Sequence, residues 1–248
     1  MATRADRPRV ALVTGAARRI GAVIARRLHA AGYDVALHAR RSRAELDALA
    51  AELERARASS TLALEADLGD IGALPRLVSA TVDRFGRLDA LVNNAAAFYP
   101  TPIAAATAAQ WDELFATNAR APFFLSQAAA PHLAASSGAI VNIVDIYAEQ
   151  PLAAYPIYSM SKAALAAMTK ALARDLAPEV RVNGVAPGAV LWPEEGKSEA
   201  SRQAVIERTP LKRTGSPDDI ASAVLWLLDA EFVTGEIVRV DGGRHLAM

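Results

Sequence analysis

Residues 10–21 read VALVTGAARRIG, and this stretch decides the fold that the rest of the chain has to match. Its first four residues are all apolar, as in a strand that is buried on both faces. A turn containing Gly15 follows and leads through Gly21 into a helical pattern. Such a turn lets the backbone approach a pyrophosphate, whose charge then lies at a helix N-terminus. The turn alone is a weak signal, because glycine is also common in purely structural turns.

Short apolar runs and longer helical patterns alternate along the whole chain. Helical patterns cover 20–31, 44–56 and 71–85. The expected strands are 10–13, 34–37, 62–65, 90–92, 140–144, 181–185 and 237–240. This alternation is typical of a parallel sheet with helices on both faces. We therefore predict an α/β fold in which residues 1–248 form a single doubly wound Rossmann-type domain around a mostly parallel seven-stranded sheet.

The least regular stretch is 188–215, which is rich in proline, glycine and charge. A loop of this length inside a compact domain usually has a function, and we predict a substrate loop here. The loop should end at Ser216, because a serine hydroxyl can cap a helix. Pro217 in the first turn and the acidic residues after it favour the same helix start.

The composition excludes several classes of function. The 27 basic and 27 acidic residues cancel, so no net field favours nucleic acid or an anionic membrane. The chain has no cysteine, which excludes disulfides, thiolate metal sites and cysteine nucleophiles. Its four histidines lack the spacing of a ligand pair, so we expect no metal. The N-terminus resembles no secretory signal and no apolar run could span a membrane, so we expect a cytoplasmic protein.

Arginines near the predicted turn favour NADP over NAD. Arg18 and Arg19 lie in the turn itself, and HARRS (38–42) follows the second predicted strand. An NAD site usually has an acidic residue at this strand end, to hold the ribose hydroxyls. A guanidinium instead binds an additional 2′-phosphate through paired hydrogen bonds. The alternative is a solvated helix start, since Arg43 and Glu45 come next.

Tyr158 and Lys162 are four residues apart, which places them on one helix face. A phenol has a pKa of about 10 and is a poor acid–base catalyst at neutral pH. A neighbouring ammonium stabilises the phenolate and lowers that pKa. Such pairs are common on helix surfaces, but this one follows the fifth strand of a dinucleotide-binding pattern.

Taken together, these motifs resemble the short-chain dehydrogenase/reductase family over almost the whole chain. They occur in the family's order as TGAARRIG (14–21), NNAA (93–96), Asn118, YSMSK (158–162) and APG (186–188). The resemblance implies Tyr158 as proton donor and Lys162 as the residue that lowers its pKa and binds the nicotinamide ribose. It also implies that Asn118 holds a proton-relay water and that the protein is a homotetramer.

Residues expected at the cofactor come from the glycine turn, the strand ends and the resemblance. Asp67 and Leu68 should meet the adenine, Asn94 should support the central strand, and Pro187 and Gly188 should flank the nicotinamide. The full set is Gly15, Arg18, Arg19, Ile20, Gly21, His38, Arg40, Arg41, Ser42, Asp67, Leu68, Asn94, Ala95, Tyr158, Lys162, Pro187 and Gly188.

Two positions depart from the general family pattern. Arg19 replaces a glycine, and Asp145 replaces a serine that precedes the tyrosine by thirteen residues. A serine hydroxyl there supports the oxyanion that develops on a carbonyl substrate, whereas a carboxylate repels it. A carboxyl group suits a nitrogen heterocycle instead. It can accept a bond from a ring N–H or, when protonated, donate to a ring nitrogen.

Two aromatic residues are candidates for the substrate site. Phe98 lies in NNAAAFYPTP (93–102), after the fourth predicted strand. Its ring could stack on a flat substrate with the nicotinamide on the other side, or it could be a core side chain. Trp192 is expected either to line the pocket or to pack in the core or under a lid.

The departures resemble the pteridine reductase branch of the family. That resemblance implies NADP(H) as cofactor and reduction of dihydropterins to tetrahydro forms, with dihydrofolate as a further substrate. The implied substrate residues are Arg19, Phe98, Asp145, Tyr158 and Trp192, and the implied catalytic residues are Asp145, Tyr158, Lys162 and Asn118. One mismatch with this branch is that Ala96 and Ala97 stand where better-known members carry small hydroxyl residues. A polar contact to the pterin or the cofactor is then missing, which affects substrate range and affinity.

Two other functions remain open. A generic NADPH-dependent carbonyl reductase of the 3-oxoacyl or sugar-alcohol type shares everything except the pterin pocket, but Asp145 and Arg19 argue against it. A non-catalytic NADP-binding scaffold is the second alternative, and the intact pair of Tyr158 and Lys162 argues against that.

Overall fold

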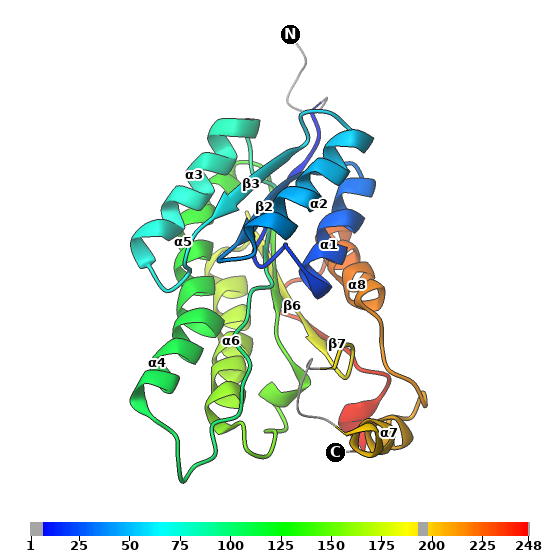
Figure 1. Ribbon diagram of the computed structural model, residues 1–248. Helices are drawn as coiled ribbons and strands as arrows, with labels where there is room; N and C mark the ends of the chain where they lie inside the picture. Colours follow the sequence, from blue (N-terminus) through cyan, green and yellow to red (C-terminus); the bar gives the residue numbers. More distant parts are fainter. Residues whose placement is uncertain (1–6, 193–197, 248) are drawn as a thin grey trace.

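In the computed structural model, which describes residues 7–192 and 198–247, a seven-stranded sheet forms the centre of the molecule (Figure 1). Its order is β3-β2-β1-β4-β5-β6-β7 and all neighbouring strands are parallel. The strands are β1 Val10–Val13, β2 Asp34–Ala39, β3 Thr61–Glu65, β4 Ala90–Asn93, β5 Ala139–Ile143, β6 Arg181–Pro187 and β7 Ile237–Val240. The predicted doubly wound α/β fold is therefore confirmed.

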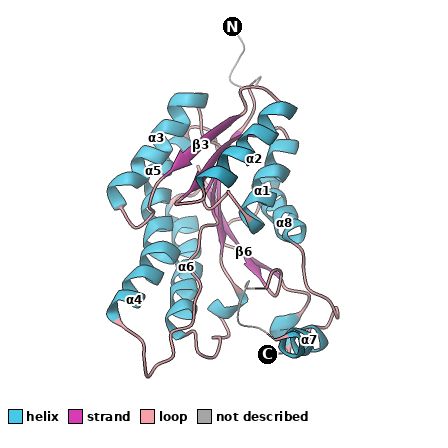
Figure 2. Cartoon of the chain, viewed as in Figure 1, coloured by secondary structure: helices cyan, strands magenta, loops and turns pink. Residues whose placement is uncertain are grey.

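Helices cover both faces of this sheet (Figure 2). They are α1 Arg19–Ala30, α2 Arg43–Ala56, α3 Leu74–Phe85, α4 Ala108–Phe115, α5 Ala121–Ala134, α6 Pro156–Asp175, α7 Glu199–Arg208 and α8 Pro217–Asp229. One face packs against α1, α2 and α8, and the other against α3, α5 and α6. Within the described ranges, none of these helices is long and apolar enough to cross a lipid bilayer.

Each central strand supplies side chains to both faces in turn. In β1, Ala11 and Val13 belong to the core under α1 and α8, whereas Val10 and Leu12 belong to the core under α3 and α5. All four are at most 1% exposed. A strand buried on both sides reads as an unbroken apolar run, which is why the sequence predicts it well.

The structure corrects the prediction of an irregular segment over 188–215. Helix α7 lies inside it and begins after Ser198, whose hydroxyl accepts a bond from Ser201 N at 3.2 Å. No residue of α7 is buried, so the sequence carries no amphipathic pattern there to reveal it. The predicted helix start at Ser216 is confirmed by a capping box with Asp219. Residues 193–197 lie outside the described part.

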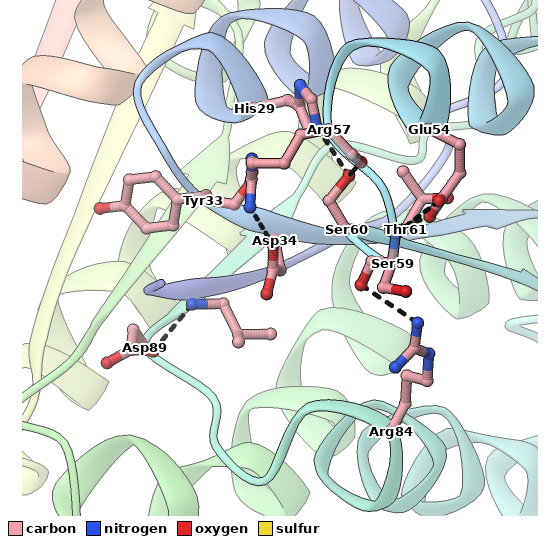
Figure 3. A network of polar contacts seen from close by, with 11 residues as sticks. His29, Tyr33, Asp34, Glu54, Arg57, Ser59, Ser60, Thr61, Arg84 and Asp89 are labelled. Atoms are coloured by element: carbon pink, nitrogen blue, oxygen red, sulfur yellow. Dashed lines mark hydrogen bonds and ion pairs between the residues drawn. The ribbon is translucent and has the colours of Figure 1, made fainter. Parts of the chain in front are cut away.

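Polar contacts tie α1, β2 and β3 together at the edge of the sheet where β2 begins (Figure 3). Nε2 of His29 lies 2.8 Å from the Ser60 hydroxyl, and the Arg57 guanidinium binds Asp34. Ser60 donates its own proton to the Arg57 carbonyl, so His29 must be the donor to Ser60. Burial and the nearby Arg57 charge lower the pKa of His29, which is therefore neutral in the folded protein.

Candidate active site

A pocket of about 740 Å³ opens beyond the carboxyl ends of the strands. It lies where the strand order reverses, between β1 and β4, and is lined from both sides by residues such as Gly15 and Asn94. In open α/β sheets this is the position where ligands bind. All the site residues predicted from the sequence line this pocket except Asn118.

The turn after β1 can pack closely against its neighbours only because of its glycines. A Cβ atom on Gly21 would lie 2.1 Å from the Gly15 carbonyl oxygen, and Gly15 itself has a φ of +63°. The Asn94 amide donates to the carbonyls of Thr14 and Gly15, at 2.8 and 3.1 Å, and holds the turn in place. The turn therefore presents main chain at the start of α1, as a pyrophosphate requires.

His38 supports this turn from behind. Its ring is buried, its Nδ1 accepts from Gly15 N at 3.3 Å, and its Nε2 lies 3.1 Å from the Ala66 carbonyl. These partners require a neutral ring with the proton on Nε2. Burial lowers the pKa of His38, which favours the same neutral form. Both ring nitrogens are occupied by main chain, so His38 holds Gly15 in place.

Cationic side chains surround the part of the pocket beyond β2. Arg40 and Arg41 are exposed and line it together with Ser42. Arg18 lines the same region, with a side chain 62% exposed and 3.7 Å from Glu45. Guanidinium groups and a hydroxyl are donors suited to a phosphate monoester. The donor set therefore fits a phosphorylated dinucleotide.

Arg19 adopts a backbone conformation that favours glycine. Its φ is +55°, in the left-handed region where a side chain costs about 1–2 kcal/mol. This backbone conformation accounts for the glycine that the resemblance to the family implies at this position. The Arg19 guanidinium donates to the Trp192 carbonyl at 3.3 Å and so connects the cofactor turn to the far wall of the pocket.

Tyr158, Asp145 and Lys162 lie together at the ends of β5 and α6. The Tyr158 hydroxyl donates to Oδ2 of Asp145 at 2.6 Å, and Oδ1 accepts from Tyr147 N at 2.9 Å. The Lys162 ammonium donates to the Ile143 carbonyl at 2.8 Å. Tyr158 and Lys162 are 4% and 2% exposed, so water screens the charges of Asp145 and Lys162 only weakly.

Burial dominates the proton affinities of this group. It raises the pKa of Asp145, against the opposing effects of the hydrogen bonds and of Lys162. Burial and the Asp145 carboxylate raise the pKa of Tyr158 well above 10, and burial lowers the pKa of Lys162 to about 8. The spacing of Tyr158 and Lys162 predicts a lowered pKa for Tyr158, and this prediction is wrong for this structure. Tyr158 instead holds its proton at neutral pH.

The interpretation of Phe98 as a core side chain is wrong. It is 41% exposed and lines the pocket. Its ring stacks on Tyr155 with centroids 4.7 Å apart and meets the edge of Tyr158 at the same distance. Tyr155 was missed by the sequence reasoning, although it lies three residues before Tyr158 and so on the same side of the helix start.

Asn118 lies in a π-helical turn, Ala116–Arg120, between α4 and α5. Its Oδ1 accepts from Ala97 N at 2.9 Å, and its Nδ2 donates to the Ala97 carbonyl and the Ser161 hydroxyl, both at 3.0 Å. The side chain thus ties the loop before Phe98 to α6. A relay water at Asn118 would have to bind the main chain.

Comparison with known proteins agrees with this geometry. The family model described as enoyl-(acyl carrier protein) reductase matches residues 15–245. The chain is 40% identical over 253 residues to a Streptomyces violaceoruber protein named as ketoacyl reductase 2 of the granaticin polyketide synthase, covering 99% of this chain and 100% of the relative. It is 37% identical over 279 residues to pteridine reductase 1 of Leishmania tarentolae, covering 96% of each.

A third relative is the 3-oxoacyl-[acyl-carrier-protein] reductase of Staphylococcus aureus strain Mu50, 32% identical over 241 residues, covering 95% of this chain and 98% of the relative. The chain belongs to the short-chain dehydrogenase/reductase family. It is an oxidoreductase of that family, whose reductases use NAD(P)H and act on small molecules.

Proposed function

We propose that this protein reduces dihydropterins to their tetrahydro forms with NADPH, and that dihydrofolate is a further substrate. The observation that carries the proposal is the 2.6 Å hydrogen bond from Tyr158 to Asp145, made beside the exposed ring of Phe98. An acid, a phenol and a flat apolar surface at one end of a pocket match a flat nitrogen heterocycle.

Asp145 is suited to ring nitrogens in either protonation state. As a carboxylate it already accepts from Tyr158 and Tyr147, and each oxygen keeps a lone pair for a ring N–H or amino group. Because burial raises its pKa, the protonated form is also accessible and can donate to a ring nitrogen. A ketone has no N–H to donate to the carboxylate, which would lie against the negative charge that develops on the ketone oxygen.

Phe98 supports the same choice through shape. Tyr155 stacks against its ring at an interplanar angle of 15°, which fixes the plane of the phenyl group. A pterin stacked on the open side of Phe98 would lie parallel to that plane. Offset stacking of this kind contributes about 0.5–1.5 kcal/mol beyond the apolar area buried.

In the proposed mechanism, the turn after β1 and the arginines beyond β2 would hold NADPH, which would supply the hydride needed to reduce a ring C=N bond. Tyr158 gives its hydroxyl proton to the adjacent nitrogen, so that the C=N bond becomes CH–NH. Asp145 orients the heterocycle and, for a more oxidised pterin, donates the proton itself. Lys162 balances the charge left on Tyr158, and a water on the Asn118 main chain returns the proton from solvent.

The preference for NADP over NAD belongs to the proposal as well. It is supported by Arg40, Arg41 and Ser42 beyond the end of β2 and by Arg18 in the turn, all lining the pocket. We expect the 2′-phosphate among these groups, and we assign Arg19 to the cofactor phosphates and the substrate.

A second candidate is a carbonyl reductase of the 3-oxoacyl type. The observation in its favour is the 40% identity to a protein named as a ketoacyl reductase, over that protein's whole length. Asp145 decides between the two, because it should favour the heterocycle and disfavour the ketone. A non-catalytic scaffold is excluded by any turnover of NADPH.

The test measures NADPH oxidation with dihydrobiopterin, dihydrofolate, an acetoacetyl thioester and a simple ketone in parallel. We expect turnover with the two pterins only. Asp145→Ser should reduce pterin turnover at least tenfold, on the scale of a lost general acid. Turnover confined to the carbonyl compounds, or full pterin turnover by Asp145→Ser, would refute the pterin assignment.

The resemblance to the family also predicts a homotetramer. Half-exposed aromatic residues on α4 and α5 support assembly, because Trp111 is 43% exposed and Phe123 is 41% exposed. Light scattering coupled to size-exclusion chromatography would give the number of copies directly.

A further inference from the structure

The described part of the chain ends in a compact segment that we call the C-terminal hook, residues 241–247. Gly242 and Gly243 turn the chain with φ values of +66° and +82°. The side chain of Asp241 is only 4% exposed, and it accepts from Gly243 N at 2.9 Å and from His245 N at 2.8 Å. Its Oδ2 also lies 2.7 Å from Nδ1 of His245. The hook is therefore closed by its own polar contacts.

One contact joins the hook to the segment that carries Asp145. Residues 145–152 begin at Asp145 and end at Leu152, and both of these residues line the pocket. Between them, Gln150 donates from Nε2 to the His245 carbonyl at 2.9 Å. The middle of a pocket segment is thus held by the last turn of the chain.

Further contacts join the hook to two other walls. Arg244 donates to the carbonyl of Val205, which lines the pocket from α7, at 3.4 Å. Figure 1 shows the C-terminal segment lying against α7. On the other side, a Cβ atom added to Gly188 would lie only 2.6 Å from Cβ of Asp241. The hook therefore packs closely against the chain just after β6.

We propose that the C-terminal hook is a positioning element for the substrate end of the pocket, and that Gln150 and His245 are its positioning residues. The proposal rests on the proposed function, because this end of the pocket is where the pterin would lie. The phosphate and adenine end of the pocket is formed by 15–21 and 38–42, and in the described part of the chain no hydrogen bond or ion pair joins these ranges to the hook. Breaking the link between Gln150 and the hook should therefore weaken substrate binding more than cofactor binding.

The kinetic test compares Gln150→Ala, His245→Ala and the double variant with the wild type. The control is Gln127→Ala, which removes an exposed amide on α5. Each single variant should raise KM for dihydrobiopterin about fivefold, the scale of one lost hydrogen bond, with kcat changed less than about twofold. His245→Ala keeps the main-chain carbonyl that accepts from Gln150 and loosens the hook through the lost ring contact with Asp241. The double variant should therefore be no worse than Gln150→Ala, which removes the link itself. Unchanged KM values, or effects that multiply, would overturn the proposal.

A second measurement separates this proposal from the proposed function. Hydrogen–deuterium exchange in peptides covering 145–152 should be faster in Gln150→Ala and His245→Ala than in the wild type, and unchanged in the Gln127→Ala control. Gln150→Ala leaves the hook sequence intact, so it tests the link even where His245→Ala does not fold. If the wild type fails to reduce any pterin, the proposed function fails while the exchange result still decides the role of the hook. Equal exchange in all four proteins would refute that role.

Discussion

The backbone conformation of Arg19 can be tested by comparing two substitutions that remove the same side chain. Arg19→Gly and Arg19→Ala both lose the guanidinium and its bond to the Trp192 carbonyl. Only alanine keeps a Cβ atom at a φ of +55°, where it costs about 1–2 kcal/mol. Glycine offsets part of that difference, because its greater freedom in the unfolded chain costs about 0.4–1 kcal/mol. Arg19→Gly should therefore be more stable than Arg19→Ala by about 0.5–1 kcal/mol.

Equilibrium urea unfolding, followed by tryptophan fluorescence, measures this difference. Arg26 provides the matched control, since it lies inside α1 and pairs with Glu52 at 2.7 Å. There the order should reverse, with glycine about 1 kcal/mol less stable than alanine. NADPH affinity should fall about tenfold in both Arg19 variants, because both lose the charge-assisted bond to phosphate that we propose for Arg19. An Arg19→Ala protein as stable as Arg19→Gly would refute the strained conformation.

Three further predictions follow from the site and the fold. Tyr158→Phe should lower kcat at least a hundredfold while changing the Kd for NADPH less than about twofold, and a stopped-flow assay showing surviving turnover would exclude Tyr158 as proton donor. Tyr155→Leu should raise KM for dihydrobiopterin by about two- to tenfold, because Phe98 loses its stacking partner, whereas Tyr155→Phe should match the wild type. The free energy of unfolding should decrease as pH falls below about 6.5, because His29 and His38 have lowered pKa values in the folded protein and so bind protons more readily when unfolded. Replacing both histidines with glutamine should flatten that pH dependence, and an unchanged slope would contradict the assignment.

The fold could be predicted from sequence because the central strands are buried on both sides. Residues such as Val10 and Val13 face different cores, so the apolar run persists and marks the strand. The pocket could be predicted for a related reason, since strand ends and the turn after β1 must meet at one edge of a parallel sheet. Helix α7 could not, because a helix without buried residues has no apolar stripe to detect.

The chemistry of the site was less accessible to sequence reasoning. Spacing places Tyr158 and Lys162 on one helix face, but the pKa of Tyr158 depends on burial and on Asp145, which only the folded chain brings within 2.6 Å. The same holds for Tyr155, whose stacking on Phe98 joins two segments far apart in sequence. The predicted role of His38 was incomplete because its partners, Gly15 and Ala66, lie on other strand ends.

The division of the interior into two cores has a consequence for engineering. The sheet keeps the side chains beneath α1 and α8 apart from those beneath α3 and α5. Substitutions at distant sites without shared partners usually have additive effects on stability. Stabilising changes could therefore be selected separately on each face and then combined, for instance one near Leu28 and one near Leu125. Repacking of this kind raises thermal tolerance while leaving the strand ends, and so the pocket, in place.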